Sequence, residues 1–281
     1  MRDTLERALV RASSHPATSR LAGKLAELRL PRPLLAPAIA LYCRTFSVDR
    51  TEAEETVSGY PTFNAFFTRH LRAGARPVAA GPGILVAPCD ARLHACGPIP
   101  TNGLIEQVKG RTYSVEALLG SSEDAAAFRG GFTATLYLSP AMYHRVHAPI
   151  AGQVRAWRYI PGRLFPVNAM GVRHVDGLFA RNERVVVFLD SKEAGPVAVV
   201  LVGAANVGRI TLAFTDLVTN TRGAAGYFLP PHPIPLGRGD ELGVFNLGST
   251  VVLLAANPRL TSAGPVAGDL VRMGEAFWRT N

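Results

Sequence analysis

The first part of the chain repeats apolar residues at every third or fourth position, a spacing that places them on one face of a helix. The segments with this pattern are residues 4–12, 17–28 and 34–46, followed by a shorter aromatic segment at 61–69. Pro31 and Pro33 separate the second segment from the third. The pattern therefore predicts an N-terminal helical segment over residues 1–75.

After Arg76 the chain consists of short runs rich in Val, Ile, Leu, Thr and Tyr, which Gly and Pro separate. The expected strands cover residues 84–87, 132–138, 152–160, 184–189, 197–202, 209–214 and 250–255, and a helical turn is expected at 114–119. Runs of this kind predict an antiparallel β domain, either a sandwich or a barrel. The expected fold class is mainly β (α+β), with a β-rich domain over residues 76–281.

The 281 residues carry a formal net charge of +9, which indicates an anionic partner. A membrane surface fits better than nucleic acid, because the sequence has no aromatic-plus-basic signature, zinc-finger spacing or long Lys/Arg run. The first fifty residues hold nine Lys/Arg among leucines and alanines. This pattern fits an interfacial helix and, equally, a helical hairpin with a solvated basic face.

Cellular context follows from what the sequence lacks. Cys43, Cys89 and Cys96 have no metal-site spacing and are expected to be reduced thiols of a cytosolic protein. Residues 1–7 are too charged for a signal peptide. No apolar stretch approaches the roughly 20 residues that span a bilayer, so no membrane crossing is expected.

The sequence Leu-Gly-Ser-Thr at residues 247–250 stands directly before the apolar run 251–256. Glycine leaves its carbonyl unshielded and tolerates strained geometry, so the Ser249 hydroxyl could attack the Gly248 carbonyl. The resulting ester would break by elimination, and hydrolysis of the dehydroalanine would leave a pyruvoyl group, an electron sink for amine substrates. The alternative is an ordinary Gly-Ser turn that opens a buried strand.

His144 and His147 lie in Tyr-His-Arg-Val-His, after the expected strand 132–138. A zinc site would need a third ligand, which the sequence does not clearly offer. Neutral imidazole can instead accept a proton from serine near pH 7. Asp90 is either a turn residue or a buried partner of an imidazole. Asp90, His147 and Ser249 could form a Ser-His-Asp set, but the sequence does not show that they meet.

Several segments, taken together and in this order, closely resemble those of the phosphatidylserine decarboxylases. The segments are residues 61–76, 109–115, 138–149, 165–168, 182–185, 202–208 and 239–250. They extend over roughly residues 60–256, whereas the helical N-terminal segment matches in character more than in sequence. The resemblance implies a two-sheet β core that membrane-facing helices precede. It also implies a peripheral protein on the cytoplasmic face of the inner membrane and a homodimer of cleaved units.

The resemblance implies that the Gly248–Ser249 bond cleaves itself, leaving a β chain, residues 1–248, associated with an α chain, residues 249–281. Ser249 would be the nucleophile, His147 its general base and Asp90 the residue that orients His147. A pyruvoyl group made from Ser249 would be the cofactor, and no metal is expected. Its carbonyl would form a Schiff base with phosphatidylserine, which loses CO2 to give phosphatidylethanolamine.

Other residues are candidates for further roles, with structural support of the His147 loop as the alternative for His144 and a tight turn fixed by Pro166 as the alternative for the entrance. His144 is the candidate proton donor in decarboxylation. The apolar side chains of the expected substrate entrance face the acyl chains and its asparagine faces the headgroup; this entrance consists of Phe165, Pro166, Val167 and Asn168. The candidates for binding the lipid phosphate are Arg111, Arg145 and Arg163.

Three other functions compete with this hypothesis. A pyruvoyl enzyme for a soluble amino acid would not need the basic, leucine-bearing N-terminal segment. A serine hydrolase would be expected to carry a Gly-x-Ser-x-Gly elbow around Ser249, which the sequence lacks. A non-catalytic lipid-binding relative would not need Asp90, His147 and the Gly-Ser pair.

Overall fold

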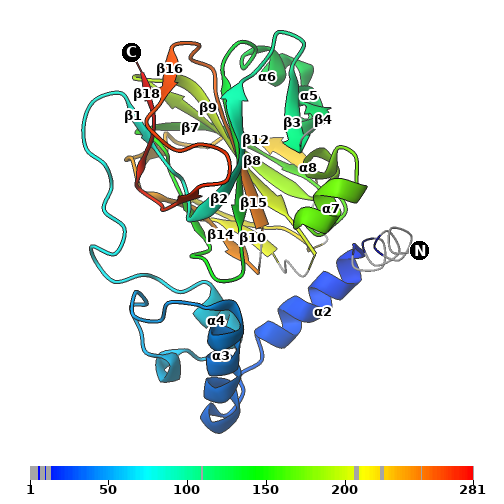
Figure 1. The fold of residues 1–281 in the computed structure, drawn as a ribbon, viewed down its shortest axis with the longest axis vertical. Coiled ribbons are helices and arrows are strands. Elements are labelled where there is room, and N and C mark those ends of the chain that lie inside the picture. The colour runs from blue at the N-terminus through cyan, green and yellow to red at the C-terminus, as the bar shows by residue number, and fades with distance from the viewer. Residues whose placement is uncertain are drawn as a thin grey trace.

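A nine-stranded antiparallel sheet lies at the centre of the protein (Figure 1). The structure is a computed structural model that describes Glu6, Val10 and residues 14–108, 110–205, 209–221, 225–247 and 249–280. The strand order is β12 (Gly226–Phe228), β7 (Gly152–Ile160), β8 (Arg184–Ser191), β9 (Gly195–Gly203), β15 (Ser249–Ala255), β5 (Phe132–Leu138), β2 (Ala91–Pro98) and β17 (Leu270–Val271), and β13 (Pro235–Leu236) also pairs with β7.

A second sheet packs against one face of the first. Its order is β11 (Thr215–Val218), β10 (Arg209–Leu212), β14 (Glu241–Asn246) and β6 (Arg145–His147). Val146, Ile210 and Phe245 of this sheet share one buried cluster with residues of the large sheet. A smaller sheet contains β1 (Ile84–Val86), β18 (Ala276–Thr280) and β16 (Leu260–Ser262), and β3 (Leu104–Val108) pairs with β4 (Arg111–Ser114). The described strands close no barrel, and the expected mainly β fold with two packed sheets is confirmed.

Short helices cover the other face of the large sheet. They are α5 (Val115–Leu119), α6 (Ser122–Ala126), α7 (Ala169–His174) and α8 (Leu178–Arg181). Strand β15 shows why both faces are covered. Val251 and Leu253 lie in the cluster shared with the second sheet, whereas Val252 and Leu254 pack with Leu118 of α5. Alternate side chains of a strand point to opposite faces, so this uniformly apolar run forms a strand buried on both sides.

Strand β15 also positions the Gly-Ser pair. All seven of its residues are buried, and it pairs along its whole length with β5 on one side and β9 on the other. Ser249 is opposite Leu138 and Gly203 in these two pairings. A Cβ added to Gly203 would lie 3.0 Å from Leu164 Cδ2 and 3.2 Å from Glu183 O, so a side chain there would press on both neighbours. Ser249 therefore begins a central strand next to a crowded backbone position.

The N-terminal helices lie below the β core (Figure 1). They are α2 (Pro16–Ala26), α3 (Arg32–Phe46) and α4 (Phe63–Phe67), with one 3₁₀ turn at Val57–Gly59. These helices confirm the segments expected at 17–28, 34–46 and 61–69. Helix α3 begins at Arg32, because a proline in the first turn costs no backbone hydrogen bond. The segment expected at 4–12 lies outside the described residues except for Glu6 and Val10, which are helical.

Candidate active site

Ser249 presents a free hydroxyl at the start of β15. Its side chain is 1% exposed, and its Oγ has no hydrogen-bond partner among the described residues. The backbone just before it is strained, because Leu247 has φ 83°, a region that side-chain-bearing residues rarely adopt. Such conformations cost about 1–3 kcal/mol. Gly248, the acceptor side of the expected cleavage, lies outside the described residues.

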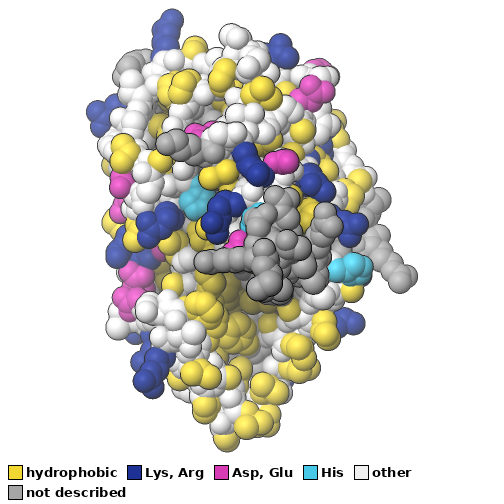
Figure 2. Space-filling view, turned by 45° about the vertical axis from the view of Figure 1, so that its right-hand side comes forward, with side chains coloured by type: hydrophobic (Ala, Val, Ile, Leu, Met, Phe, Trp, Pro, Cys, Tyr) yellow, Lys and Arg dark blue, Asp and Glu magenta, His cyan; other side chains and the backbone are white. Residues whose placement is uncertain are grey.

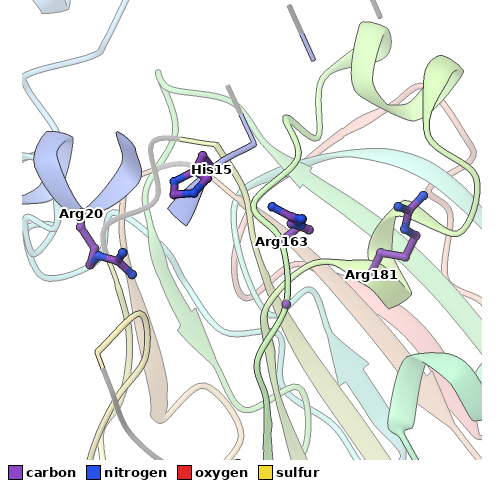
Figure 3. A pocket seen from close by; sticks show the side chains of 5 residues that line it. His15, Arg20, Arg163 and Arg181 are labelled. Atoms are coloured by element: carbon purple, nitrogen blue, oxygen red, sulfur yellow. The ribbon is translucent and has the colours of Figure 1, made fainter. Parts of the chain in front are cut away.

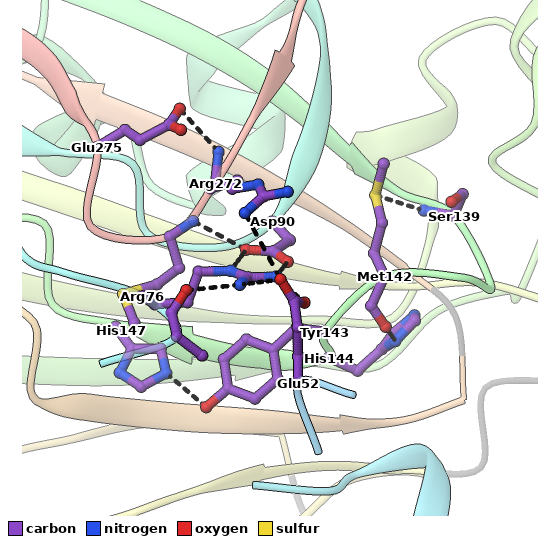
Figure 4. Close-up of polar contacts among 12 residues, drawn as sticks. Glu52, Arg76, Asp90, Ser139, Met142, Tyr143, His144, His147, Arg272 and Glu275 are labelled. Carbon is purple, nitrogen blue, oxygen red and sulfur yellow. Dashed lines mark hydrogen bonds and ion pairs between the residues drawn. The ribbon is translucent and has the colours of Figure 1, made fainter. Parts of the chain in front are cut away.

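His147 on β6 is held through both ring nitrogens, and Figure 4 shows the contact of one of them with Tyr143. Its Nδ1 lies 2.8 Å from Gly239 O and its Nε2 lies 3.1 Å from Tyr143 Oη. A carbonyl only accepts, so Nδ1 carries the proton and Nε2 accepts from the Tyr143 hydroxyl. Burial lowers the pKa of His147, which keeps the ring neutral near pH 7 and able to act as a base. Neither nitrogen is left for a metal ion.

Asp90 forms its hydrogen bonds with other groups than the His147 ring. Its carboxylate accepts from Arg76 Nε at 2.8 Å, from Arg76 Nη2 at 2.5 Å and from Met273 N at 2.9 Å (Figure 4). Arg76 also binds Glu52 at 2.8 Å. Among the hydrogen bonds of the described residues, none joins Asp90 to His147. The effect of burial on the His147 pKa is partly offset by the bond to Gly239 O and by the Glu241 charge, and the Asp90 charge adds a smaller effect in the same direction.

His144 is completely buried beneath the N-terminal helices. Its Nδ1 donates to Met142 O at 2.8 Å, and its ring centroid lies 4.0 Å from that of Phe67 in α4. Burial lowers the pKa of His144 to about 3, so the ring is neutral near pH 7. Nε2 is then a buried acceptor without a partner among the described residues. Phe245 N donates to His144 O at 3.0 Å, which ties His144 to β14, the strand that leads to Leu247 and Ser249.

The expected substrate entrance is tied to the strand beside Ser249. Asn182 Nδ2 donates to Phe165 O at 2.9 Å and to Gly203 O at 2.8 Å, and Asn182 Oδ1 accepts from Phe165 N. Phe165 and Val167 are buried, Pro166 is half-buried and Asn168 is exposed. Asn168 Oδ1 caps α7 by accepting from Gly171 N at 3.1 Å. This capping bond uses one lone pair of Oδ1 and leaves the two Asn168 Nδ2 protons for a ligand.

Two of the three candidate phosphate ligands already have acidic partners. Arg111 lies 2.7 Å from Asp176, and Arg145 lies 2.6 Å from Glu241. The Arg163 guanidinium is exposed and has no acidic partner among the described residues. A paired guanidinium has less net charge to offer an anion, so Arg163 is the candidate that the structure favours.

Sequence reasoning assigned no role to several residues that hold the site together. Tyr143 lies inside the histidine motif, and its hydrogen bond to His147 could have been suspected from that position. Three other contacts join residues that are distant in sequence. The separation is 92 residues between the Gly239 carbonyl and His147, 14 between the Arg76 guanidinium and Asp90, and 17 between the Asn182 amide and Phe165. No local pattern marks contacts over such separations.

Comparison with known proteins agrees with the motifs. The family described as phosphatidylserine decarboxylase matches residues 63–279. A phosphatidylserine decarboxylase proenzyme of Myxococcus xanthus is 41% identical over 276 residues, which are 98% of this chain and 98% of the relative. Proteins of the same name from Stutzerimonas stutzeri and Pseudomonas paraeruginosa are each 46% identical, over 94% of this chain and 90% and 92% of their own. The chain therefore belongs to the phosphatidylserine decarboxylase family.

Proposed function

We propose that this enzyme converts phosphatidylserine to phosphatidylethanolamine with a pyruvoyl group that it makes from its own Ser249. The observation that carries the proposal is the Ser249 hydroxyl, which is buried, lacks a partner among the described residues and begins the central strand β15. Relatives that match nearly the whole chain are named proenzymes, which supports activation by cleavage. The proposed cleavage point is the Gly248–Ser249 bond.

In the proposed cleavage, Ser249 Oγ attacks the Gly248 carbonyl carbon, and an ester replaces the amide. His147 is the proposed base, and the Tyr143 hydroxyl on its Nε2 can relay the proton. The Asp90 charge favours the protonated ring that this transfer creates. Loss of the Ser249 α-proton then expels the Gly248 carboxylate. Water hydrolyses the resulting dehydroalanine, which releases ammonia and leaves the pyruvoyl group.

The backbone before the cleavage point supports this chemistry. The positive φ of Leu247 stores strain in the uncleaved chain. Cleavage frees the chain on that side and relieves the strain. The strain thus lowers the stability of the uncleaved chain relative to the products.

The two product chains are expected to stay together. Residues 249–255 form β15, which lies between β5 and β9 of the other chain. Strands β17 and β18 of the same product pair with β2 and β1. Separation would therefore break backbone hydrogen bonds in two sheets and expose a buried strand.

The surroundings of Ser249 fit the proposed cofactor. Gly203 on the adjacent strand has no side chain, and His144 Nε2 is a buried acceptor that no described group uses. A pyruvoyl group supplies a ketone that accepts the electrons of the bond between Cα and the departing carboxylate. We assign His144 the return of a proton to Cα. Burial keeps the ring neutral near pH 7, so Nε2 first takes this proton from water and then passes it to Cα.

The proposed entrance consists of Phe165, Pro166, Val167 and Asn168. Asn182 fixes this segment to Gly203, the register partner of Ser249. The buried Phe165 and Val167 hold the segment in the fold, while the exposed Asn168 keeps its amide group for the headgroup. The entrance segment is thus joined, through the Asn182 side chain, to the strand next to Ser249.

The intact mass of the purified protein under denaturing conditions tests the proposal. We expect two chains that meet at Gly248–Ser249, the smaller carrying a pyruvoyl-sized N-terminus. Vesicles of phosphatidylserine should then yield phosphatidylethanolamine and CO2. One unbroken chain without activity would instead support a non-catalytic lipid-binding relative. Two chains that decarboxylate only free amino acids would support a different pyruvoyl enzyme.

The N-terminal helices support attachment to an anionic membrane surface. Figure 2 shows hydrophobic side chains gathered over the lower, helical part of the molecule, with Lys and Arg above them. Exposed large apolar side chains on and between α2 and α3 are Leu21, Leu25, Leu28, Leu30, Leu34, Leu41 and Phe46. No helix in the described ranges is long and apolar enough to cross a membrane. Exposed leucines beside basic residues are typical of helices that lie in the membrane interface.

Replacing both Leu21 and Leu25 by glutamate is expected to weaken binding to anionic vesicles at least about tenfold. These side chains are 59% and 58% exposed, so the change removes apolar contact area without disturbing the core. Burying one leucine contributes about 1.5–3 kcal/mol, and 1.4 kcal/mol corresponds to tenfold in affinity. Vesicle sedimentation measures the effect.

The matched control for this prediction is the double replacement of Leu229 and Leu270 by glutamate. These leucines are 67% and 62% exposed on the β domain. The control changes the net charge equally, so it should lose less affinity if the helices are the docking face. Equal losses in the two double variants would assign the binding to overall charge.

A further inference from the structure

A basic cavity of about 550 Å³ lies between the start of α2 and the entrance segment (Figure 3). Its lining residues are His15, Arg20, Gly162, Arg163 and Arg181. Figure 3 shows His15 and Arg20 on the α2 side, with Arg163 between them and Arg181 of α8. The described lining of the cavity thus collects three guanidinium groups and an imidazole, and it contains no acidic side chain.

Acidic groups of the described residues offset little of the positive charge of the arginines in this cavity. Arg163 has no acidic partner within the described ranges, and Arg181 lies over the Phe165 ring at 5.1 Å. Arg20 makes a long hydrogen bond of 3.5 Å to Asn220. The buried Glu183 interacts electrostatically with Arg20: burial raises the pKa of Glu183 and Arg20 lowers it. A cavity with uncompensated arginines is electrostatically suited to an anion.

Helix α2 adds to the positive potential. His15 is its N-cap, and His15 Nδ1 accepts from Ala17 N at 3.1 Å. A neutral His15 ring therefore carries its proton on Nε2 and can donate. The positive end of the eleven-residue helix lies at this cavity, because its N-cap residue lines it.

Short covalent and hydrogen-bonded links connect the lining of the cavity to the strand next to Ser249. The backbones of Arg163 and Asn182 form an isolated parallel β-bridge, and the Asn182 side chain donates to Gly203 O. Leu164, the next residue, packs on Gly203, which is the register partner of Ser249. In phosphatidylserine the phosphate is separated from the reacting Cα only by Cβ and one ester oxygen. A phosphate site must therefore lie close to Ser249, and these links join Arg163 to the strand next to Ser249.

A second cavity connects this region with the membrane-facing leucines. It measures about 650 Å³, and Arg20, Lys24, Leu28 and Arg209 are among its lining residues. Arg20 lines both cavities, and Leu28 is one of the exposed apolar residues. A lipid that enters beside Leu28 would pass Arg20 with its headgroup leading.

We infer that His15, Arg20, Arg163 and Arg181 form the subsite that binds the phosphodiester of the lipid headgroup. The inference rests on the proposed function and adds to it the group that recognises the substrate. Arg163 and Arg181 supply the direct contacts from the entrance side. Arg20 supplies a contact from α2 and links the subsite to the membrane-facing cavity.

Titration calorimetry of the cleaved, full-length protein tests the subsite with three probes. Glycerophosphoethanolamine carries the phosphodiester, ethanolamine carries only the amine, and inorganic phosphate carries no headgroup. We expect Arg163→Ala and Arg181→Ala each to weaken glycerophosphoethanolamine binding about 10- to 100-fold, since charge-assisted hydrogen bonds contribute about 1.5–3 kcal/mol. Ethanolamine binding should not change. Both arginines are exposed, so their truncation should not prevent folding or self-cleavage.

Arg129→Ala is the matched control, because it removes the same charge from an exposed position. Arg129 lies near Gly131, which packs on Ala255 at the opposite end of β15 from Ser249. That end is about 20 Å away at 3.3 Å per residue. This variant should bind all three probes as the parent does.

Several outcomes would overturn the subsite. These are unchanged glycerophosphoethanolamine binding in Arg163→Ala and Arg181→Ala, no binding of this probe by the parent, or equally tight, arginine-dependent binding of inorganic phosphate. The last result would indicate a site for free phosphate. A parent that decarboxylates phosphatidylserine with arginine-independent binding would retain the proposed function and lose the subsite. Arginine-dependent binding of glycerophosphoethanolamine by a parent without this activity would retain the subsite and remove the proposed function.

Discussion

Replacing Ser249 by alanine is expected to leave one unbroken chain of 281 residues with no decarboxylase activity. The substitution removes the only atom that the proposed cleavage uses as nucleophile and the only source of the pyruvoyl group. Folding should not suffer, because the lost hydroxyl is buried and forms no hydrogen bond with the described residues. Denaturing mass spectrometry and release of CO2 from phosphatidylserine vesicles measure the two effects.

Thr250→Val provides a matched control one residue along the same strand. The Thr250 hydroxyl is also buried without a partner among the described residues, and valine has nearly the same shape. This variant should cleave and decarboxylate as the parent does. If Ser249→Ala still yields two chains, another group attacks the backbone and the assignment of Ser249 is wrong. If Thr250→Val also stays unbroken, the block reflects altered packing of β15 and not a lost nucleophile.

Local sequence patterns predict the parts of this fold that local interactions determine. Helices α2 and α3 follow from apolar residues on one face, and β15 follows from an apolar run that is long enough for a central strand. The short strands β6, β13 and β17 contain two or three residues each, and they exist because distant segments pair with them. A run of two or three residues carries no periodicity, so these strands could not be expected from the sequence.

The chemistry of the site could be predicted further than its geometry. A Gly-Ser bond, two histidines and an aspartate indicate which atoms can react. Their contacts depend on the fold: the His147 ring is fixed by the Gly239 carbonyl, and every residue type has such a carbonyl. Asp90 is drawn to Arg76 because a buried carboxylate needs a counter-charge. The sequence therefore suggested Asp90 for the site but not the buried ion pair that Asp90 forms.

His144→Asn is expected to leave self-cleavage complete and to slow decarboxylation by about 10²–10⁴-fold. Asparagine can donate to Met142 O in place of Nδ1, so the loop should keep its shape. It has no counterpart of the free Nε2, the atom that we propose carries the proton to Cα. A positioned acid contributes a factor of this size. The mass of the product chains and the initial rate on phosphatidylserine vesicles measure the two steps separately.

Phe67→Leu distinguishes proton transfer from packing, because Phe67 contacts the His144 ring and carries no proton. It should slow decarboxylation much less than His144→Asn. In D2O, a positioned donor delivers deuterium to one face of Cα, so the parent should give phosphatidylethanolamine of a single configuration. His144→Asn should give a mixture, since solvent can reach either face. A slow variant that keeps the single configuration would show that another group delivers the proton and that His144 only supports the loop.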